Sequence, residues 1–221
     1  MKGMCMKDFL TKQFIAGNKT MTRRTGGLEA VNVDPDNWTH DPLFIDTARL
    51  DNFFYKNNEG TQLCLTLKPN YAKGSTVFIK EGYVPGYFDN GSTAYATDWN
   101  AVAAELMPRP KFKNKLFMPA SEARYFVRIE DVYPQRLQDI SEEDAIKEGV
   151  ESSVDFPDCY KFYSPLKQFT SKSLNGGIPL CKTAVVSFAT LIDSINGKGT
   201  WDKNPWVWVY KIKLVDKPEN L

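Results

Sequence analysis

A lysine and a hydroxyl lie three residues apart in the run Gly17-Asn18-Lys19-Thr20-Met21-Thr22-Arg23-Arg24. In a turn or a folded loop, Lys19 and Thr22 can approach each other, and a lysine kept as the free amine by burial can take the proton of the hydroxyl. Arg23 and Arg24 would lower the lysine pKa by like-charge repulsion, and they would also bind a phosphate or an oxyanion. An ordinary basic surface loop has the same spacing.

Two carboxylates are further candidates. Glu148 falls in the last turn of an expected short helix, where the helix dipole disfavours a negative charge, and such a misfit can mark a functional residue. Glu81 ends an expected strand beside Lys80, where it could pair with a basic residue inside a cleft. The alternatives are a solvated helix carboxylate for Glu148 and an ordinary strand-end ion pair for Glu81.

A third candidate is a basic run near the middle of the chain that is interleaved with aromatic residues. Such a pattern suits phosphate contact and base stacking, although a solvated loop can look the same. Its members are Arg109, Lys111, Lys113, Lys115, Phe112 and Phe117.

Composition narrows the classes of protein that these residues could serve. The 221 residues carry a net charge of +1, which excludes a strongly basic nucleic-acid coat protein but not a local basic groove. The single histidine, His40, lies in an expected loop, so we expect no histidine-based metal site and no cofactor. The start of the chain has no apolar signal segment and no run is long enough to cross a bilayer. We therefore expect a cytoplasmic protein with reduced thiols and no membrane partner.

The elements that must position these residues are short strands with a few helices. We expect a helix over 4–16 ended by Gly17, a hairpin of 53–55 with 62–67, and strands over 76–81, 125–132 and 206–215. Pro134 should stop the strand before it. Ser141 and Thr183 should each cap a helix, the first ending at Gly149 and the second running through Ile195.

Together these elements predict a mostly β fold with flanking helices, of the α+β class. We expect a single domain over residues 1–221, interrupted by polar insertions near 28–73, 85–115 and 151–182.

The run from Gly17 to Arg24 resembles the G-x-K-x-x-T-x-R signature of ASCH domains, which belong to the PUA-like superfamily. Residues 76–81, 117–121, 137–149 and 193–209, together with Arg124, resemble the larger phage- and prophage-associated members. Phe78 and Lys80 stand where those members often have a tryptophan and an arginine. The matching blocks cover roughly half of the chain.

The resemblance implies a PUA-like pseudobarrel of mixed, mainly antiparallel strands and an association with RNA. Small relatives hydrolyse N4-acetylcytidine with a lysine, a threonine and a glutamate, which by motif position fall on Lys19, Thr22 and Glu148. The signature arginine falls on Arg24. Thr20 is a second hydroxyl in the same run, so the nucleophile could be either threonine.

Three functions follow, of different classes. The first is an RNA- or nucleotide-binding domain of phage or mobile-element origin, whose basic cleft uses Arg23, Arg24, Arg124 and Glu81 around the signature loop. The second is an amidohydrolase that acts on an N-acylated nucleoside through Lys19, Thr22 and Glu148. The third is a phage protein-interaction factor, which an exposed apolar patch on one of the insertions would favour.

Overall fold

The computed structural model describes residues 1–40, 51–55, 63–99, 103, 107–163 and 180–219. Contacts divide the chain into two compact units. The first unit comprises Met1–Thr20, Tyr71–Asp131 and Lys211–Leu221, and the second comprises Met21–Asn70 and Val132–Tyr210. The organisation as one domain with three insertions stays a prediction.

The described residues confirm the α+β class. Their α-helices are α1 (Asp8–Ile15), α3 (Glu142–Lys147) and α4 (Ala184–Asn196). Their strands are β1 (Gly3–Cys5), β2 (Met21–Arg24), β3 (Trp38–His40), β4 (Asp51–Tyr55), β5 (Leu63–Leu67), β6 (Thr76–Lys80), β7 (Tyr83–Val84), β8 (Ala94–Tyr95), β9 (Phe126–Arg136), β10 (Tyr160–Lys161), β11 (Leu180–Cys181) and β12 (Trp206–Val215). Short 3-10 turns are η1 (Val31–Val33), η2 (Pro35–Asn37), η3 (Ala96–Asp98), η4 (Lys115–Phe117), η5 (Ala120–Glu122) and η6 (Leu137–Asp139).

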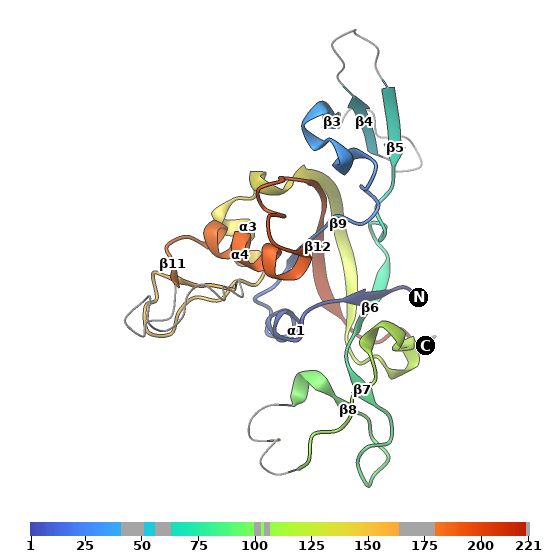
Figure 1. Ribbon diagram of the computed structural model, residues 1–221. Helices are drawn as coiled ribbons and strands as arrows, with labels where there is room; N and C mark the ends of the chain where they lie inside the picture. The colour runs from blue at the N-terminus through green and yellow to red at the C-terminus, as the bar shows by residue number, and fades with distance from the viewer. Residues whose placement is uncertain (41–50, 56–62, 100–102, 104–106, 164–179, 220–221) are drawn as a thin grey trace. The chain divides into compact units, whose positions relative to one another are not determined.

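The main sheet has five strands in the order β1-β6-β9-β12-β2, and smaller sheets have the orders β3-β4-β5, β7-β8 and β10-β11 (Figure 1). Strand β1 runs parallel to β6, with Met4 opposite Ile79. Strand β6 runs antiparallel to β9, with Val77 opposite Val127. The main sheet is therefore mixed.

The first unit packs a small apolar core against β6 and the start of β9. The buried side chains of this core come from β6, β7, the start of β9 and the segment just before β9. They are Phe78, Tyr83, Met118, Ala123 and Phe126. Because Met118 and Ala123 come from the segment just before β9, this core fixes the chain on both sides of Arg124.

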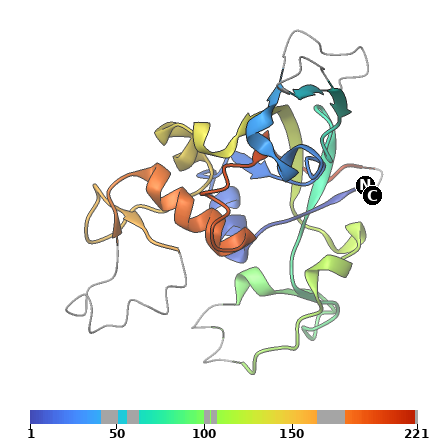
Figure 2. The ribbon, with the colours of Figure 1, turned by 45° about the horizontal axis from the view of Figure 1, so that its top comes forward.

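In the second unit, α3 and α4 pack against each other (Figure 2). The cap predicted for α3 is confirmed, because the Ser141 hydroxyl accepts the Asp144 N–H over 3.1 Å. The cap predicted for α4 is also confirmed, because the Thr183 hydroxyl accepts the Val186 N–H over 3.2 Å. The Glu142 carboxylate of α3 also accepts the Ala184 N–H over 2.7 Å, so it joins the start of one helix to the start of the other.

Of three further sequence predictions, the hairpin is confirmed, whereas the start of the first helix and the loop at His40 are wrong. The expected hairpin is present as β4 and β5, with Phe53 opposite Leu65, while its turn lies outside the described residues. The expected start of the first helix is wrong, because Met4 lies in β1 and α1 begins at Asp8. His40, expected in a loop, lies in β3, where its Nε2 is 2.9 Å from Asp51 Oδ1.

Pro134 does not end its strand, since β9 continues to Arg136. The ladder with β6 covers only Phe126 to Arg128 of β9. On that side, Pro134 therefore lies beyond the paired part of β9, where a missing N–H breaks no ladder bond with β6.

Candidate functional site

The signature segment begins where α1 ends. Gly17 has a φ of +80°, a conformation that glycine adopts without strain, and the N–H groups of Asn18 and Lys19 both donate to the Gln13 carbonyl. This turn leads into β2 at Met21. The predicted C-terminal cap at Gly17 is therefore confirmed.

Half of the side chains of this segment are buried, which argues against the alternative of an ordinary basic surface loop. Lys19 is 2% exposed and Thr22 is 6% exposed, whereas the neighbouring Thr20 is exposed. Lys19 belongs to the first unit and Thr22 to the second. Burial distinguishes the two threonines, which the sequence left as equal candidates for the nucleophile.

Arg23 donates hydrogen bonds to three side chains of the second unit. Its Nη1 donates to Glu148 Oε1 over 3.1 Å, and its Nη2 donates to Asp144 Oδ2 and Gln135 Oε1, each over 3.0 Å. Arg23 and Glu148 are both buried. The negative charges of these two carboxylates balance the positive charge of the buried guanidinium.

This network shows which groups the Arg23 guanidinium contacts within the protein. In the structure the terminal nitrogens of Arg23 are bonded to protein oxygens, and the expectation that Arg23 holds a phosphate or substrate group stays a prediction. The observed role of Arg23 is to hold Glu148. Nothing in the sequence indicated that Gln135 and Asp144 are partners of Arg23.

Glu148 lies at the C-cap of α3, the position that the sequence identified as unfavourable for a carboxylate. Its backbone N–H donates to the Asp144 and Ala145 carbonyls, so it closes the last turn of the helix. The positive charge of Arg23 offsets the unfavourable end of the helix dipole. The misfit in the sequence therefore marks a buried ion pair.

In the first unit, Glu81 is buried and forms the predicted pair with a basic residue. Arg124 donates from Nε to Glu81 Oε2 over 3.0 Å and from Nη2 to Glu81 Oε1 over 2.9 Å. The Thr97 hydroxyl also donates to Glu81 Oε1. Arg124 further binds Asp98 Oδ2 over 2.7 Å, so both faces of its fork are occupied.

Burial raises the pKa of the Glu81 carboxyl above its ordinary value, and the hydrogen bonds and charge of Arg124 oppose this rise. Burial alone would lower the pKa of the Arg124 guanidinium, but its hydrogen bonds to Glu81 and Asp98 raise that pKa above the ordinary value. Arg124 therefore stays charged, and Glu81 is the member of the pair that titrates.

Two tyrosine rings hold the Arg124 guanidinium in place. Its Cζ lies 4.0 Å from the centre of the Tyr95 ring and 4.8 Å from the centre of the Tyr125 ring. With bidentate bonding to Glu81 and these cation–π contacts, Arg124 ties β6, β8 and η3 to the segment before β9. The expectation that Arg124 binds nucleic acid stays a prediction, and its observed contacts are structural.

Most side chains of the predicted run of basic and aromatic residues are exposed to solvent. We call Arg109, Lys111, Lys113, Leu116 and Phe117 the basic–aromatic surface of the first unit. Phe117 is 80% exposed and Leu116 is 58% exposed. Arg109, Lys111 and Lys113 are exposed, and no ion pair joins them to a carboxylate of the described residues. Lys115 differs, because its Nζ donates to the Met6 carbonyl over 2.6 Å.

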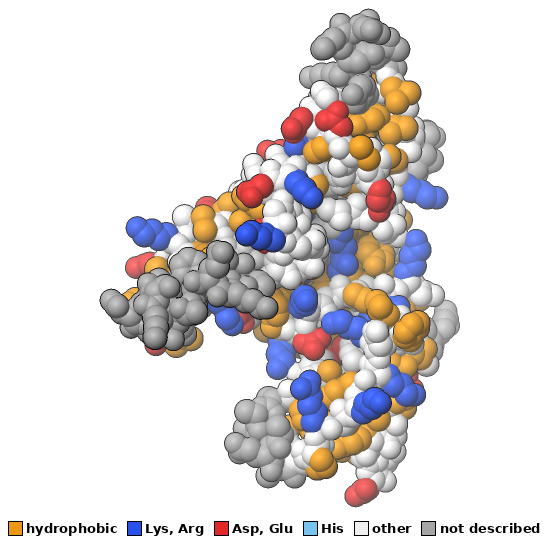
Figure 3. Space-filling view, viewed as in Figure 1, with side chains coloured by type: hydrophobic (Ala, Val, Ile, Leu, Met, Phe, Trp, Pro, Cys, Tyr) orange, Lys and Arg blue, Asp and Glu red, His pale blue; other side chains and the backbone are white. Residues whose placement is uncertain are grey.

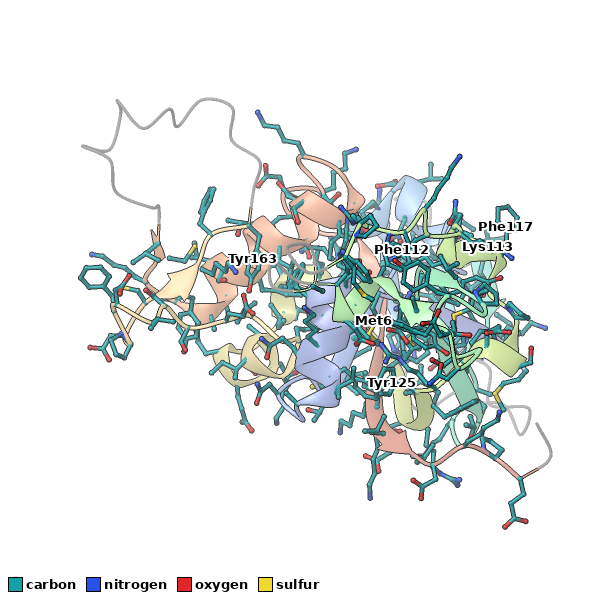
Figure 4. The ribbon with its side chains drawn as sticks, turned by 90° about the horizontal axis from the view of Figure 1, so that it is seen from below. Met6, Phe112, Lys113, Phe117, Tyr125 and Tyr163 are labelled. Carbon is teal, nitrogen blue, oxygen red and sulfur yellow. The ribbon has the colours of Figure 1, made fainter. Side chains whose placement is uncertain are left out.

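Contacts between aromatic rings hold the chain segment that carries this surface. The Phe112 ring makes an edge contact with Trp99 at 6.0 Å, Trp99 contacts Tyr87 at 6.0 Å, and the Tyr87 hydroxyl donates to the Pro108 carbonyl. Figure 4 labels Phe112, Lys113 and Phe117 among the side chains of the first unit. Figure 3 shows Lys and Arg side chains among hydrophobic ones over the part of the first unit that carries β7 and β8.

Two further findings concern ligand classes. Within the ranges that the structure describes, no group of three or more His, Cys, Asp and Glu residues could hold a metal ion. Within the same ranges, no helix has the length and apolar character needed to cross a membrane.

Comparisons with known proteins complete the description of the site. No family model matches the chain, and neither the curated proteins nor the solved structures gave a match to it.

Proposed function

We propose that the protein binds single-stranded RNA through the basic–aromatic surface of the first unit. The observation that carries this proposal is the exposed Phe117 ring in a segment where Lys111 and Lys113 have no carboxylate partner among the described residues, whereas Lys115 pairs with Asp8. Residues 107–117 contain Arg109, Lys111, Lys113 and Lys115 and no Asp or Glu. The segment is therefore strongly positive although the whole chain is nearly neutral.

Single-stranded nucleic acid fits this chemistry better than a duplex does. Lysine and arginine side chains follow a phosphate backbone, and an exposed aromatic ring can stack on any base that is not already paired. The backbone of the segment is braced by the packing of Phe112 on Trp99, so Phe117 and the lysines are presented on a supported chain.

The proposal moves the nucleic-acid contact away from the signature loop. Arg23 and Arg124 are bonded to carboxylates and Lys19 is buried, so the charges that were expected to grip phosphates are engaged within the protein. Freeing either arginine for a phosphate would leave a buried carboxylate without its partner, which is costly. The exposed lysines of residues 107–117 carry no such cost.

The test is the anisotropy of a fluorescein-labelled oligouridine titrated with the protein at several salt concentrations. We expect affinity to fall as salt rises. Replacing both Lys111 and Lys113 by Gln should reduce the slope of log affinity against log salt by about 0.7 for each lysine that contacts a phosphate. A double replacement of the exposed Lys198 and Lys203 by Gln is the matched control and should bind as the wild type does.

Binding that ignores salt, or that the control weakens as much as the Lys111 and Lys113 pair does, would reject the proposal. The same oligomer annealed to its complement should bind more weakly, because its bases are no longer free to stack.

A second candidate function, hydrolysis of an N-acylated nucleoside, is favoured by the burial of Thr22 and Glu148 and by the bond that holds Glu148 to Arg23. In this candidate Lys19, as the free amine, takes the proton of the Thr22 hydroxyl. Thr22 Oγ attacks the acyl carbon, and Glu148 passes the proton taken by Lys19 to the nucleobase amine, which leaves. Water then attacks the threonine ester, one of its protons returns to Thr22 Oγ, and the acid is released.

Deacylation of N4-acetylcytidine, followed by chromatography, tests this candidate. Thr22→Ala and Lys19→Ala should each abolish turnover, whereas Thr20→Ala should keep it because Thr20 is exposed. Turnover that survives in Thr22→Ala rejects the mechanism, and a wild-type protein that releases no acetate rejects the candidate.

A further inference from the structure

The second unit presents a hairpin at residues 151–161 whose tip is apolar and acidic. We call it the acidic hairpin. The Lys161 N–H donates to the Glu151 carbonyl over 2.8 Å, and the Ser153 N–H donates to the Cys159 carbonyl over 2.7 Å. The Phe156 N–H is bound by the Ser153 hydroxyl. These bonds give the tip a defined conformation.

The tip leaves large apolar side chains in solvent. Val154 is 96% exposed and Phe156 is 60% exposed. Asp155 lies between them and Asp158 follows two residues after Phe156. Both acids are exposed and have no ion pair to any described residue, while Glu151 is paired with Lys161. Exposed apolar residues beside unpaired charges are typical of a surface that takes a partner.

The same chain carries the complement of this tip. Residues 151–158 contain three acids and no Lys or Arg, and residues 107–117 contain four basic residues and no acid. Each segment also exposes apolar side chains, which are Val154 and Phe156 in the hairpin and Leu116 and Phe117 in the basic–aromatic surface. Opposite charge together with exposed apolar area is the pattern of an interface that is steered electrostatically.

We propose that the acidic hairpin of one copy docks on the basic–aromatic surface of a second copy, so that the protein associates with itself head to tail. This goes beyond RNA binding and predicts that RNA and a second copy compete for one surface. The contact is small, so the association is weak and is strengthened by low salt.

Sedimentation velocity over a range of protein concentrations tests the proposal. In low salt the weight-average sedimentation coefficient should rise with concentration, and added salt should reverse the rise. Replacing Asp155 and Asp158 by Lys, or Lys111 and Lys113 by Glu, should weaken the association by at least about tenfold, because each variant then sets like charges against each other. Replacing Asp202 and Asp216 by Lys, two exposed acids elsewhere, should leave it unchanged.

The decisive experiment mixes the two charge-reversed variants. The lysine-bearing hairpin of one variant then meets the glutamate-bearing surface of the other, and the acidic hairpin of the second meets the basic surface of the first. We expect the mixture to associate although neither variant does so alone. This outcome also shows that both variants are folded.

A wild-type protein that stays monomeric at every concentration overturns the proposal, as does a mixture of the two variants that fails to associate. Either result leaves RNA binding standing, because the anisotropy titration measures it on its own. If the protein associates and oligouridine does not dissolve the assembly, self-association stands and the shared surface is rejected.

Discussion

Arg23 and Glu148 are 125 residues apart in the sequence, and the guanidinium of one is bonded to the carboxylate of the other over 3.1 Å. The bond joins β2 to the end of α3. Because both side chains are buried, removing either one takes away a charge-assisted bond inside the protein, which is costly. The stability of the second unit should therefore depend strongly on this pair.

Replacing Arg23 by Met should lower the free energy of unfolding by about 3–5 kcal/mol, because Glu148 and Asp144 would lose their shared cation. Urea denaturation followed by circular dichroism measures the loss. Lys147→Met is the control, since it removes a cation of the same helix from an exposed pair with Glu143 and should change little. Equal losses for the two variants would mean that the buried pair has no special weight.

Glu142 should stabilise α4 from outside that helix. Its carboxylate accepts the N–H groups of Ala184 and Val185, which have no partner within the first turn. We expect Glu142→Ala to cost about 1 kcal/mol in the free energy of unfolding, as the loss of a helix cap does. Glu143→Ala, which changes an exposed neighbour, should cost clearly less, and thermal unfolding monitored at 222 nm compares the two.

Glu81 should make stability depend on pH. Burial raises the pKa of its carboxyl in the folded state, so the folded protein holds a proton that the unfolded chain releases near the ordinary value of 4.5. The free energy of unfolding should therefore fall as pH rises from about 4.5 through the higher folded pKa. Urea titrations across that range should show a shallower fall in Glu81→Gln than in the wild type. If the free energy of unfolding falls equally steeply with pH in the two proteins, the fall is caused by a group other than Glu81.

Phe117 should matter for binding and not for folding. Because its ring is mostly exposed, Phe117→Ala should change the free energy of unfolding by less than about 0.5 kcal/mol. If the ring stacks on a base, the same change should weaken oligouridine binding by about 1–3 kcal/mol. Phe126→Ala is the contrasting variant, because that ring is fully buried and its loss should cost about 3–5 kcal/mol of stability. Unchanged affinity in Phe117→Ala would remove stacking from the proposal.

The ends of α3 and α4 and the last strand were predictable because their signals are local. Ser141, Thr183 and Gly149 act through their own backbone neighbours, and the structure confirms each cap or ending. Strand β12 has the expected bounds. The start of α1 was not predictable from periodicity, because Met4 fits an apolar helical stripe equally well but pairs with Ile79 in a parallel ladder.

The partners of the charged residues depend on distant parts of the chain, and there the sequence was a weaker guide. Glu148 was identified by its misfit with the helix dipole, but no local pattern points from Arg23 to Gln135. The basic cleft was expected because arginines next to a lysine suggest phosphate binding. Only the three-dimensional arrangement shows that Arg23 and Arg124 are matched by carboxylates.

Helix α3 has six residues, too few for a helix to persist alone in water. Its first turn is tied to α4 through Glu142 and to β2 through Asp144, and its C-terminal end is tied to β2 through Glu148. Amide hydrogens of α3 should therefore exchange with solvent only when one of these attachments opens, and not by fraying from an end. In Arg23→Met the exchange rates of α3 and of the start of α4 should rise together, which would make this short helix a reporter of cooperative opening in the second unit.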